Sequence, residues 1–447
     1  MEQLDSTIIS PVVPELAQAF GVEPLQLSVT MTIYLLCSLA FIPFGGPLIE
    51  RFGTRTVFRG AILTFTFSSL LCALASDLWQ LTAARALQGV AAALVVPVGR
   101  TTIVWSVPKV QLVKALAWMI TPAMVGPMLG PPLGGVIATW LSWEWIFLIN
   151  VPVGLAGYFW AQRVIPQIQE KSGTPLRWLE WVLITSFLVV VIMLVEGSRG
   201  LLPPRLMPYA MGVLLLLGGL CIGYYHYQKQ PMLNFRLLRV RSFAAGFWGG
   251  SLVRVGYGAL PFLLPLMLQI GLGFSALQSG VILLLSGLIA FFTKTQTASM
   301  LKRWGFRKVL LANGAMCGAA LLACAAFGGA HSTSLYAISI IVCIAGFARS
   351  VQFNALTAIA YADLPPSAVT GATTINTMGW QLAIMLGIST ASWVVDTSAA
   401  LGQRAQPSGT DFAIAFTALG LIALVSMYHY ARLPSNAGQA LSGCAHQ

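Results

Sequence analysis

Apolar runs of about twenty residues, separated by short polar or Gly/Pro-rich segments, follow one another along nearly the whole chain. A helix of that length crosses the hydrocarbon core of a bilayer, so each run predicts one membrane span. The pattern therefore predicts an all-α polytopic membrane protein. The fourteen predicted spans lie near residues 4–20, 27–49, 57–76, 79–105, 115–139, 145–165, 177–196, 207–227, 243–270, 277–300, 308–329, 333–360, 370–395 and 411–432.

An internal repeat divides these spans into two related halves, as in transporters built from duplicated units. The segment from Arg51 to Arg55 (RFGTR) recurs from Arg303 to Arg307 (RWGFR), and the prolines of the first span have counterparts in the ninth. We expect 1–165 and 236–432 to be two pseudo-symmetric six-helix bundles. Residues 166–235 would hold cytoplasmic linkers and two extra spans, which gives a 6+2+6 order. The tail 433–447 is predicted to be disordered and cytoplasmic.

Charge is scarce and unevenly placed. Only 9% of the residues are charged, against about 25% in a typical soluble domain, and mean hydropathy is +0.80. The net charge of +12 would suggest a nucleic-acid partner in a soluble protein. In a membrane protein, the distribution of Lys and Arg among the loops instead indicates which side of the membrane each loop lies on. Loops predicted to lie outside carry only Arg199, Arg205 and Arg404, so both termini should be cytoplasmic and no nucleic acid is expected.

Residues suited to catalysis or metal binding are scattered. The seven Cys have no paired spacing, and His226, His331, His429 and His446 fall at span ends or in the tail. An intramembrane enzyme or receptor, a different class of protein, would need such groups clustered at membrane depth. We therefore expect no enzyme activity, no metal and no cofactor. A Gly-rich phosphate-binding loop is also lacking, which argues against ATP as the energy source.

The segment from Thr121 to Gly154 is unusually rich in Gly and Pro for a membrane helix. Its repeated pairs are Gly126-Pro127, Gly130-Pro131 and Gly134-Gly135. Neighbouring helices in a bilayer can satisfy backbone groups that Pro leaves free, so we expect a kinked helix rather than a broken one. Gly130 and Gly134 share one face and should let another helix backbone approach closely. The alternative is a generic kinked membrane helix.

This segment resembles the antiporter signature of the major facilitator superfamily, and the following Trp143 to Pro152 looks like the start of helix six in its fourteen-span drug:proton antiporter branch (EmrB/QacA type, near MdtD/HsrA-type members). The resemblance implies a monomeric efflux transporter of the bacterial inner membrane. It would export amphipathic compounds in exchange for protons by alternating access. An exporter of one endogenous metabolite, such as an amino acid, siderophore or sugar phosphate, is the alternative.

The loop between spans two and three resembles a second motif of the superfamily, in which Arg residues close the cytoplasmic side. The corresponding residues here, which we call the gate loop, are Gly46, Glu50, Arg51, Gly53 and Arg55. Glu50 stands where Asp is usual in the family. The alternative is a loop that only carries the positive charge of the inner side.

Three charged residues are predicted to couple transport to protons: Asp5, Arg85 and Arg254. Asp5 lies in a stretch that resembles the first-span motif of the branch, and a carboxyl group at membrane depth can bind a proton. It could instead be a static ion-pair partner. Arg85 could reach the outer interface by snorkelling. Arg254 lies at the position of the ninth span that corresponds, in the internal repeat, to the position of Asp5 in the first span. We therefore expect the two side chains to face each other across a central cavity.

A substrate cavity is predicted from aromatic and polar residues inside spans, although such residues more often pack against neighbours or lipid. The candidates are Tyr34, Gln88, Trp118, Phe262, Arg349, Gln352, Asn354, Trp380 and Gln381.

The chain start is short for a first span. Met1 precedes Asp5 by only four residues, whereas crossing a bilayer takes about twenty. This favours the hypothesis that Met1 is an internal Met of a longer natural chain.

Overall fold

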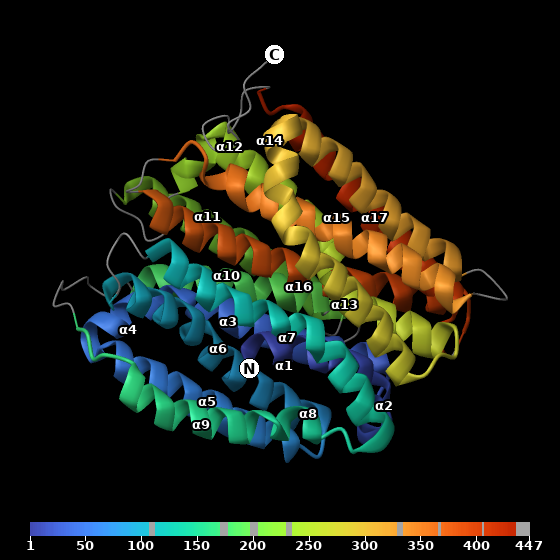
Figure 1. Ribbon diagram of the computed structural model, residues 1–447. Helices are drawn as coiled ribbons and strands as arrows, with labels where there is room; N and C mark the ends of the chain where they lie inside the picture. Colours follow the sequence, from blue (N-terminus) through green and yellow to red (C-terminus); the bar gives the residue numbers. More distant parts are fainter. Residues whose placement is uncertain are drawn as a thin grey trace. The chain divides into compact units, whose positions relative to one another are not determined.

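The computed structural model describes residues 1–106, 112–169, 178–196, 204–228, 235–328, 334–364, 368–404 and 406–434, and all regular structure among them is helical (Figure 1). The chain divides into two compact units, Met1–Met232 and Leu233–Gln447. This division falls close to the boundary predicted at 235/236. Most of the predicted tail, from residue 435 on, lies outside the described residues.

The N-terminal unit contains the first six predicted spans and the extra pair, α10 and α11. The extra pair is attached through Trp181 of α10, whose indole N–H donates to the carbonyl of Ala40 in α3 at 2.8 Å. The elements of this unit are α1 (Glu2–Ile8), η1 (Ser10–Val12), α2 (Val13–Phe20), η2 (Pro24–Leu27), α3 (Ser28–Phe41), η3 (Ile42–Phe44), α4 (Gly45–Phe52), α5 (Thr54–Ala73), α6 (Leu78–Ser106), α7 (Leu112–Trp140), α8 (Trp145–Leu148), α9 (Asn150–Val164), α10 (Trp178–Glu196), η6 (Pro204–Leu206) and α11 (Met207–Tyr227).

The C-terminal unit has fewer and longer helices. Two π-helical turns, η8 and η9, flank α13. The elements are η7 (Phe235–Arg239), α12 (Arg241–Ala244), η8 (Ala245–Gly249), α13 (Gly250–Leu266), η9 (Met267–Gly271), α14 (Ala276–Gly328), α15 (Leu335–Tyr361), α16 (Val369–Leu401) and α17 (Gly409–Ala431).

The helices agree with a multi-pass membrane protein. Eleven helical stretches of the described chain are long and apolar enough to cross a membrane, judged by length and composition. The predicted spans near 4–20, 115–139 and 177–196 are helical too, but they are not among the eleven. The all-α fold is thus confirmed, and the 6+2+6 order stays a prediction.

The first span is divided into short pieces by its prolines. Pro11 lies in η1 and Pro14 in the first turn of α2. The span therefore consists of three successive helical elements, α1, η1 and α2, instead of one continuous α-helix. Proline has no backbone N–H and therefore breaks the regular ladder of helix hydrogen bonds. The piece that carries Asp5 is only seven residues long, so its position depends on the helices around it.

The repeated loops have the same backbone conformation. Gly53 joins α4 to α5 with φ 81° and ψ 158°, and Gly305 interrupts α14 with φ 73° and ψ 165°. This region is open almost only to glycine because a Cβ atom would clash with the backbone. The repeat recognised in the sequence therefore corresponds to a repeated turn geometry.

The gate loop is tied to the segment that follows α9 in the same unit. Arg55 donates from Nε to the carbonyl of Ile165 at 2.6 Å, and Thr54 donates from its hydroxyl to Pro166 at 2.7 Å. Gln167 donates to the carbonyl of Phe52 at 2.8 Å. These bonds join the start of α5 to the segment that follows α9, and the two helices run side by side in Figure 1.

Gly305→Ala should lower stability by about 1–3 kcal/mol, because open space surrounds the site and only the backbone conformation resists the change. Gly219→Ala on α11 is the matched control, since a helical glycine in open space should gain up to about 1 kcal/mol. The thermal unfolding midpoint of the purified protein measures both. Equal midpoints for the two variants would contradict this account of the repeat.

Candidate functional site

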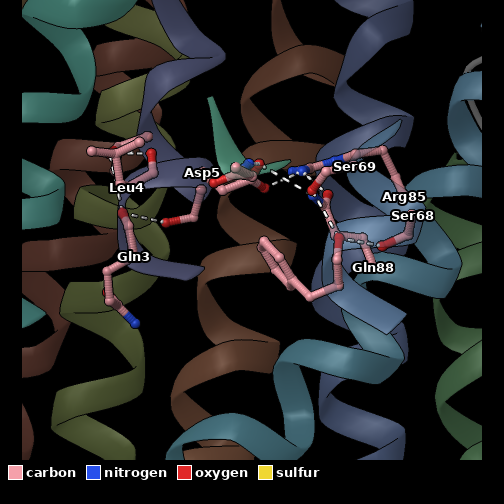
Figure 2. Close-up of polar contacts among 11 residues, drawn as sticks. Gln3, Leu4, Asp5, Ser68, Ser69, Arg85 and Gln88 are labelled. Carbon is pink, nitrogen blue, oxygen red and sulfur yellow. Dashed lines mark hydrogen bonds and ion pairs between the residues drawn. The ribbon is translucent and has the colours of Figure 1, made fainter. Parts of the chain in front are cut away.

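A cluster of polar side chains lies inside the apolar N-terminal unit, centred on Asp5 of α1 (Figure 2). The other members of the cluster come from three helices: Arg85 and Gln88 from α6 and Asn150 from the first turn of α9, which bond to Asp5, and Ser69 from α5, which bonds to Gln88. Asp5 and Gln88 are fully buried, and Arg85 and Asn150 are each 1% exposed. Residues far apart in the sequence thus converge on one carboxylate.

The Asp5 carboxylate accepts hydrogen bonds from three side chains. Arg85 donates from Nη1 to Oδ2 in a charged hydrogen bond, while Asn150 donates to Oδ1 at 2.8 Å and Gln88 at 3.2 Å. Gln88 also accepts from Arg85 Nη1 at 2.5 Å and donates to the Ser69 hydroxyl at 2.8 Å. Gln88 therefore bridges the two charges and fixes their relative position.

Aromatic rings enclose the arginine. The Arg85 guanidinium carbon lies 4.4 Å from the ring centre of Tyr34 and 5.9 Å from that of Phe147. A cation over an aromatic face is stabilised electrostatically, most strongly away from water. Within the described residues, Arg85 Nε and the Tyr34 hydroxyl have no hydrogen-bond partner. The arginine thus retains an unused donor beside the pair.

The depth of Arg85 excludes the snorkelling alternative. A guanidinium that reached the interface would be exposed to water, whereas Arg85 is 1% exposed and paired with a carboxylate. Burying two charges costs several kcal/mol each, and removing one partner of such a pair costs about 3–5 kcal/mol. An ion pair in this environment is therefore costly unless both partners stay in place.

The Gly-rich face of α7 holds the helix that carries Asp5. A Cβ atom on Gly126 would lie 2.9 Å from the Leu4 nitrogen, and one on Gly134 would overlap the Ile8 carbonyl. A Cβ on Gly130 would overlap the Thr7 hydroxyl. The close helix approach predicted at Gly130 and Gly134 is therefore confirmed. Its partner is α1, and α1 and α7 run side by side in Figure 1.

A second carboxylate accompanies Asp5 on α1. Glu2 precedes Asp5 by three residues, so both lie on the same side of the helix. Its Oε2 atom is buried and has no hydrogen-bond partner in the described chain. The short helix α1 therefore carries two buried carboxyl groups within one turn of each other.

Arg254, the third predicted coupling residue, lies in the C-terminal unit. Its guanidinium carbon lies over the ring centres of Trp380 at 3.7 Å and Phe353 at 4.1 Å, and the side chain is 4% exposed. The ionic partner of Asp5 is Arg85. The sequence singled out both residues but did not indicate that they pair. The expected facing of Asp5 and Arg254 across a cavity stays a prediction.

The remaining predicted site residues have varied surroundings. In the gate loop, Gly46 and Arg51 are exposed, Glu50 and Arg55 are half-buried and Gly53 is buried. Among the predicted cavity residues, Tyr34 and Gln88 belong to the Asp5 cluster, while Phe262 and Gln352 are buried in the C-terminal unit, where Gln352 accepts a bond from Asn313 at 3.1 Å.

Arg349, Asn354, Trp380 and Gln381 are half-buried in the same unit, whereas the Trp118 side chain lies outside the described residues. On α7, Pro127 is half-buried, and Pro131 and Gly135 are buried. The assignment of the first four residues to a substrate cavity, and of the α7 residues to an antiporter signature, stays a prediction.

Sequence reasoning missed two members of the cluster, Asn150 and Ser69. Asn150 is a single amide in an apolar stretch, two residues before Pro152, and such a polar residue inside a span is itself a signal. Ser69 carries no comparable signal, because serine bonded to its own helix is common; its hydroxyl also donates to the Phe65 carbonyl at 2.8 Å.

The chain is similar to known membrane transporters. The family model described as Major Facilitator Superfamily matches residues 1–388. A relative from Citrobacter koseri named "Putative multidrug resistance protein MdtD" is 32% identical over 445 residues, covering 98% of this chain and 93% of the relative. An Escherichia coli relative of the same name is 31% identical over the same length and coverage.

Solved structures show the same fold at lower sequence identity. A POT family transporter crystallised with 5-aminolevulinic acid superposes with a TM-score of 0.70 at 14% identity, covering 96% of this chain and 92% of that one. At this level of identity the similarity concerns the fold alone.

Gly130→Ala should destabilise the protein by about 1–3 kcal/mol, because the added methyl group overlaps Thr7 and forces α1 away from α7. Thr7→Ala removes the overlapping hydroxyl, so the double variant should recover part of that loss. Thermal unfolding midpoints of the two single variants and the double variant measure the coupling. Additive effects of the two changes would contradict the contact between α1 and α7.

Proposed function

Because this chain belongs to the major facilitator superfamily, we propose that it is a proton-coupled antiporter that exports amphipathic small molecules from a bacterial cell. Relatives named as multidrug resistance proteins along nearly the full chain support this substrate class. The protein would lie in the inner membrane with both termini in the cytoplasm, act as a monomer and use no ATP. Its partners would be protons, the exported molecule and the bilayer.

The observation that carries the proposal is the buried ion pair of Asp5 and Arg85. An antiporter needs a group that binds a proton in one state and releases it in another. Asp5 is the carboxylate of a buried ion pair, and it accepts hydrogen bonds from three side chains, those of Arg85, Gln88 and Asn150. A proton on Asp5 cancels its charge and leaves the Arg85 charge without a counter-ion.

The two protonation states therefore favour different arrangements. With Asp5 ionised, Arg85, Gln88 and Asn150 all hold α1 in the observed position. With Asp5 protonated, the strongest of these contacts is lost, and α1 and Arg85 can separate. We propose that this change accompanies alternating access, with α7 moving as the glycine-packed neighbour of α1.

The membrane potential supplies enough energy for useful export. At 100 mV each proton that enters provides about 2.3 kcal/mol, which corresponds to a roughly 40-fold concentration ratio of exported substrate. A transporter that exchanged one proton for one neutral molecule could reach that ratio.

Removing both charges together tests the proposal without leaving a buried unpaired ion. The double variant Asp5→Asn/Arg85→Gln should lose proton-driven ethidium accumulation in proteoliposomes. Because ethidium carries one positive charge, its one-for-one exchange for a proton is driven by the pH gradient alone, so the accumulation ratio should fall from roughly tenfold per unit of pH gradient towards 1. Gradient-free ethidium counterflow should persist, because substrate binding and the conformational change remain. Ethidium fluorescence measures accumulation under an imposed pH gradient and counterflow in the absence of any gradient.

Glu23→Gln, which alters an exposed carboxylate of the same unit, is the matched control and should transport like the wild type. If the double variant keeps proton-driven accumulation, Asp5 does not carry the coupled proton. Repeating the assay with Glu2→Gln then decides whether the neighbouring buried carboxylate carries it instead.

A further inference from the structure

Arg254 of α13 is a buried cation without an acidic partner in the part of the chain that the structure describes. It is 4% exposed and lies between the rings of Phe353 in α15 and Trp380 in α16. It donates from Nη1 to the carbonyl of Gly250, one turn earlier in the same helix, at 3.2 Å. Arg85 in the N-terminal unit, by contrast, has Asp5 as a counter-ion.

The sequence explains why no carboxylate pairs with Arg254. The C-terminal unit contains only three acidic residues, Asp363, Asp396 and Asp411. Asp411 caps α17, where it accepts bonds from Ser398 and Arg404 at 2.5 Å each. Asp363 is exposed, and Asp396 lies close to the C-terminal end of α16. Burial of a guanidinium without a counter-ion costs free energy of folding, so a buried arginine of this kind points to a functional role.

A second donor points to the same space as Arg254. The indole Nε1 of Trp380 is buried and has no hydrogen-bond partner among the described residues. A Cβ atom placed on Gly250 would lie 3.0 Å from Arg254 Nη1 and 3.5 Å from Trp380 Nε1, with Leu356 Cδ1 next at 3.7 Å. Two N–H donors and an apolar side chain therefore border the position where Gly250 has no side chain. Gly250 also follows the π-helical turn η8, a feature frequent at functional sites.

We infer that Arg254, Trp380 and Gly250 form a binding site for the anionic group of the transported molecule, a carboxylate in the first instance. This inference rests on the proposed function and adds that amphipathic anions are among its substrates. A carboxylate accepts from a guanidinium and a neighbouring N–H at once, and the rings of Phe353 and Trp380 hold the guanidinium plane in place. Leu356 offers an apolar surface to the rest of the ligand.

Binding of 1-pyrenebutyrate and its methyl ester tests the inference, because the ester removes the negative charge and adds only one methyl group at the carboxyl end. The full chain in phosphatidylcholine nanodiscs, with no ion gradient, should bind the carboxylate roughly tenfold or more tightly than the ester. Arg254→Gln should abolish this preference and leave ester binding unchanged. Fluorescence anisotropy of the pyrene group measures both affinities.

Two further variants separate the site from a general effect of charge. Trp380→Phe keeps a ring over Arg254 but removes the indole N–H, so the preference should weaken, whereas Trp393→Phe on the same helix should not alter it. Gly250→Ala fills the space between the donors and should weaken carboxylate binding. Lys308→Gln, which removes an exposed cation of the same unit, should have no effect.

An Arg254→Gln variant that keeps the wild-type preference, or a wild type that shows no preference, would overturn the inference. If phosphatidylglycerol in the nanodiscs weakens pyrenebutyrate binding only when Arg254 is present, the site holds a lipid phosphate, and the substrate assignment is wrong. Because no gradient is imposed, these results are independent of proton coupling. Failure of ethidium transport in the wild type would instead refute the proposed function.

Discussion

The buried ion pair between Asp5 and Arg85 is the constraint on which the N-terminal unit depends. Two charges inside an apolar bundle are tolerable only when each has its partner and the spare lone pairs find donors. Gln88 and Asn150 supply those donors, so α6 and α9 must both reach the short helix α1. The position of three helices is thus coupled to the ionisation of one carboxylate.

Close packing completes this arrangement on the opposite side. Because α1 has only seven residues and is followed by Pro11, it cannot hold its position through its own backbone bonds. The glycines of α7 let the two backbones approach until side chains would overlap, which fixes α1 by contact. Because the ion pair and the contact with α7 together hold α1, protonation of Asp5 would remove one of the two and allow α1 to shift.

The sequence predicted the elements well because apolar runs and glycine spacing are local signals. The helices, the repeat at Gly53 and Gly305 and the close approach at Gly130 all followed from such patterns. The pairing of residues from different helices could not be predicted in this way. Arg85 and Asp5 are eighty residues apart in sequence, and their pairing depends on helix packing that no local pattern specifies.

The central claim is that Asp5 changes its protonation state during transport, and infrared difference spectroscopy of the protein in lipid measures this most directly. Lowering the pH should produce a protonated carboxylic acid band that is absent in Asp5→Asn, and a bound transported substrate should shift the pH at which the band appears. An Asp5 that stays ionised throughout the pH range in which transport is proton-driven would contradict the account.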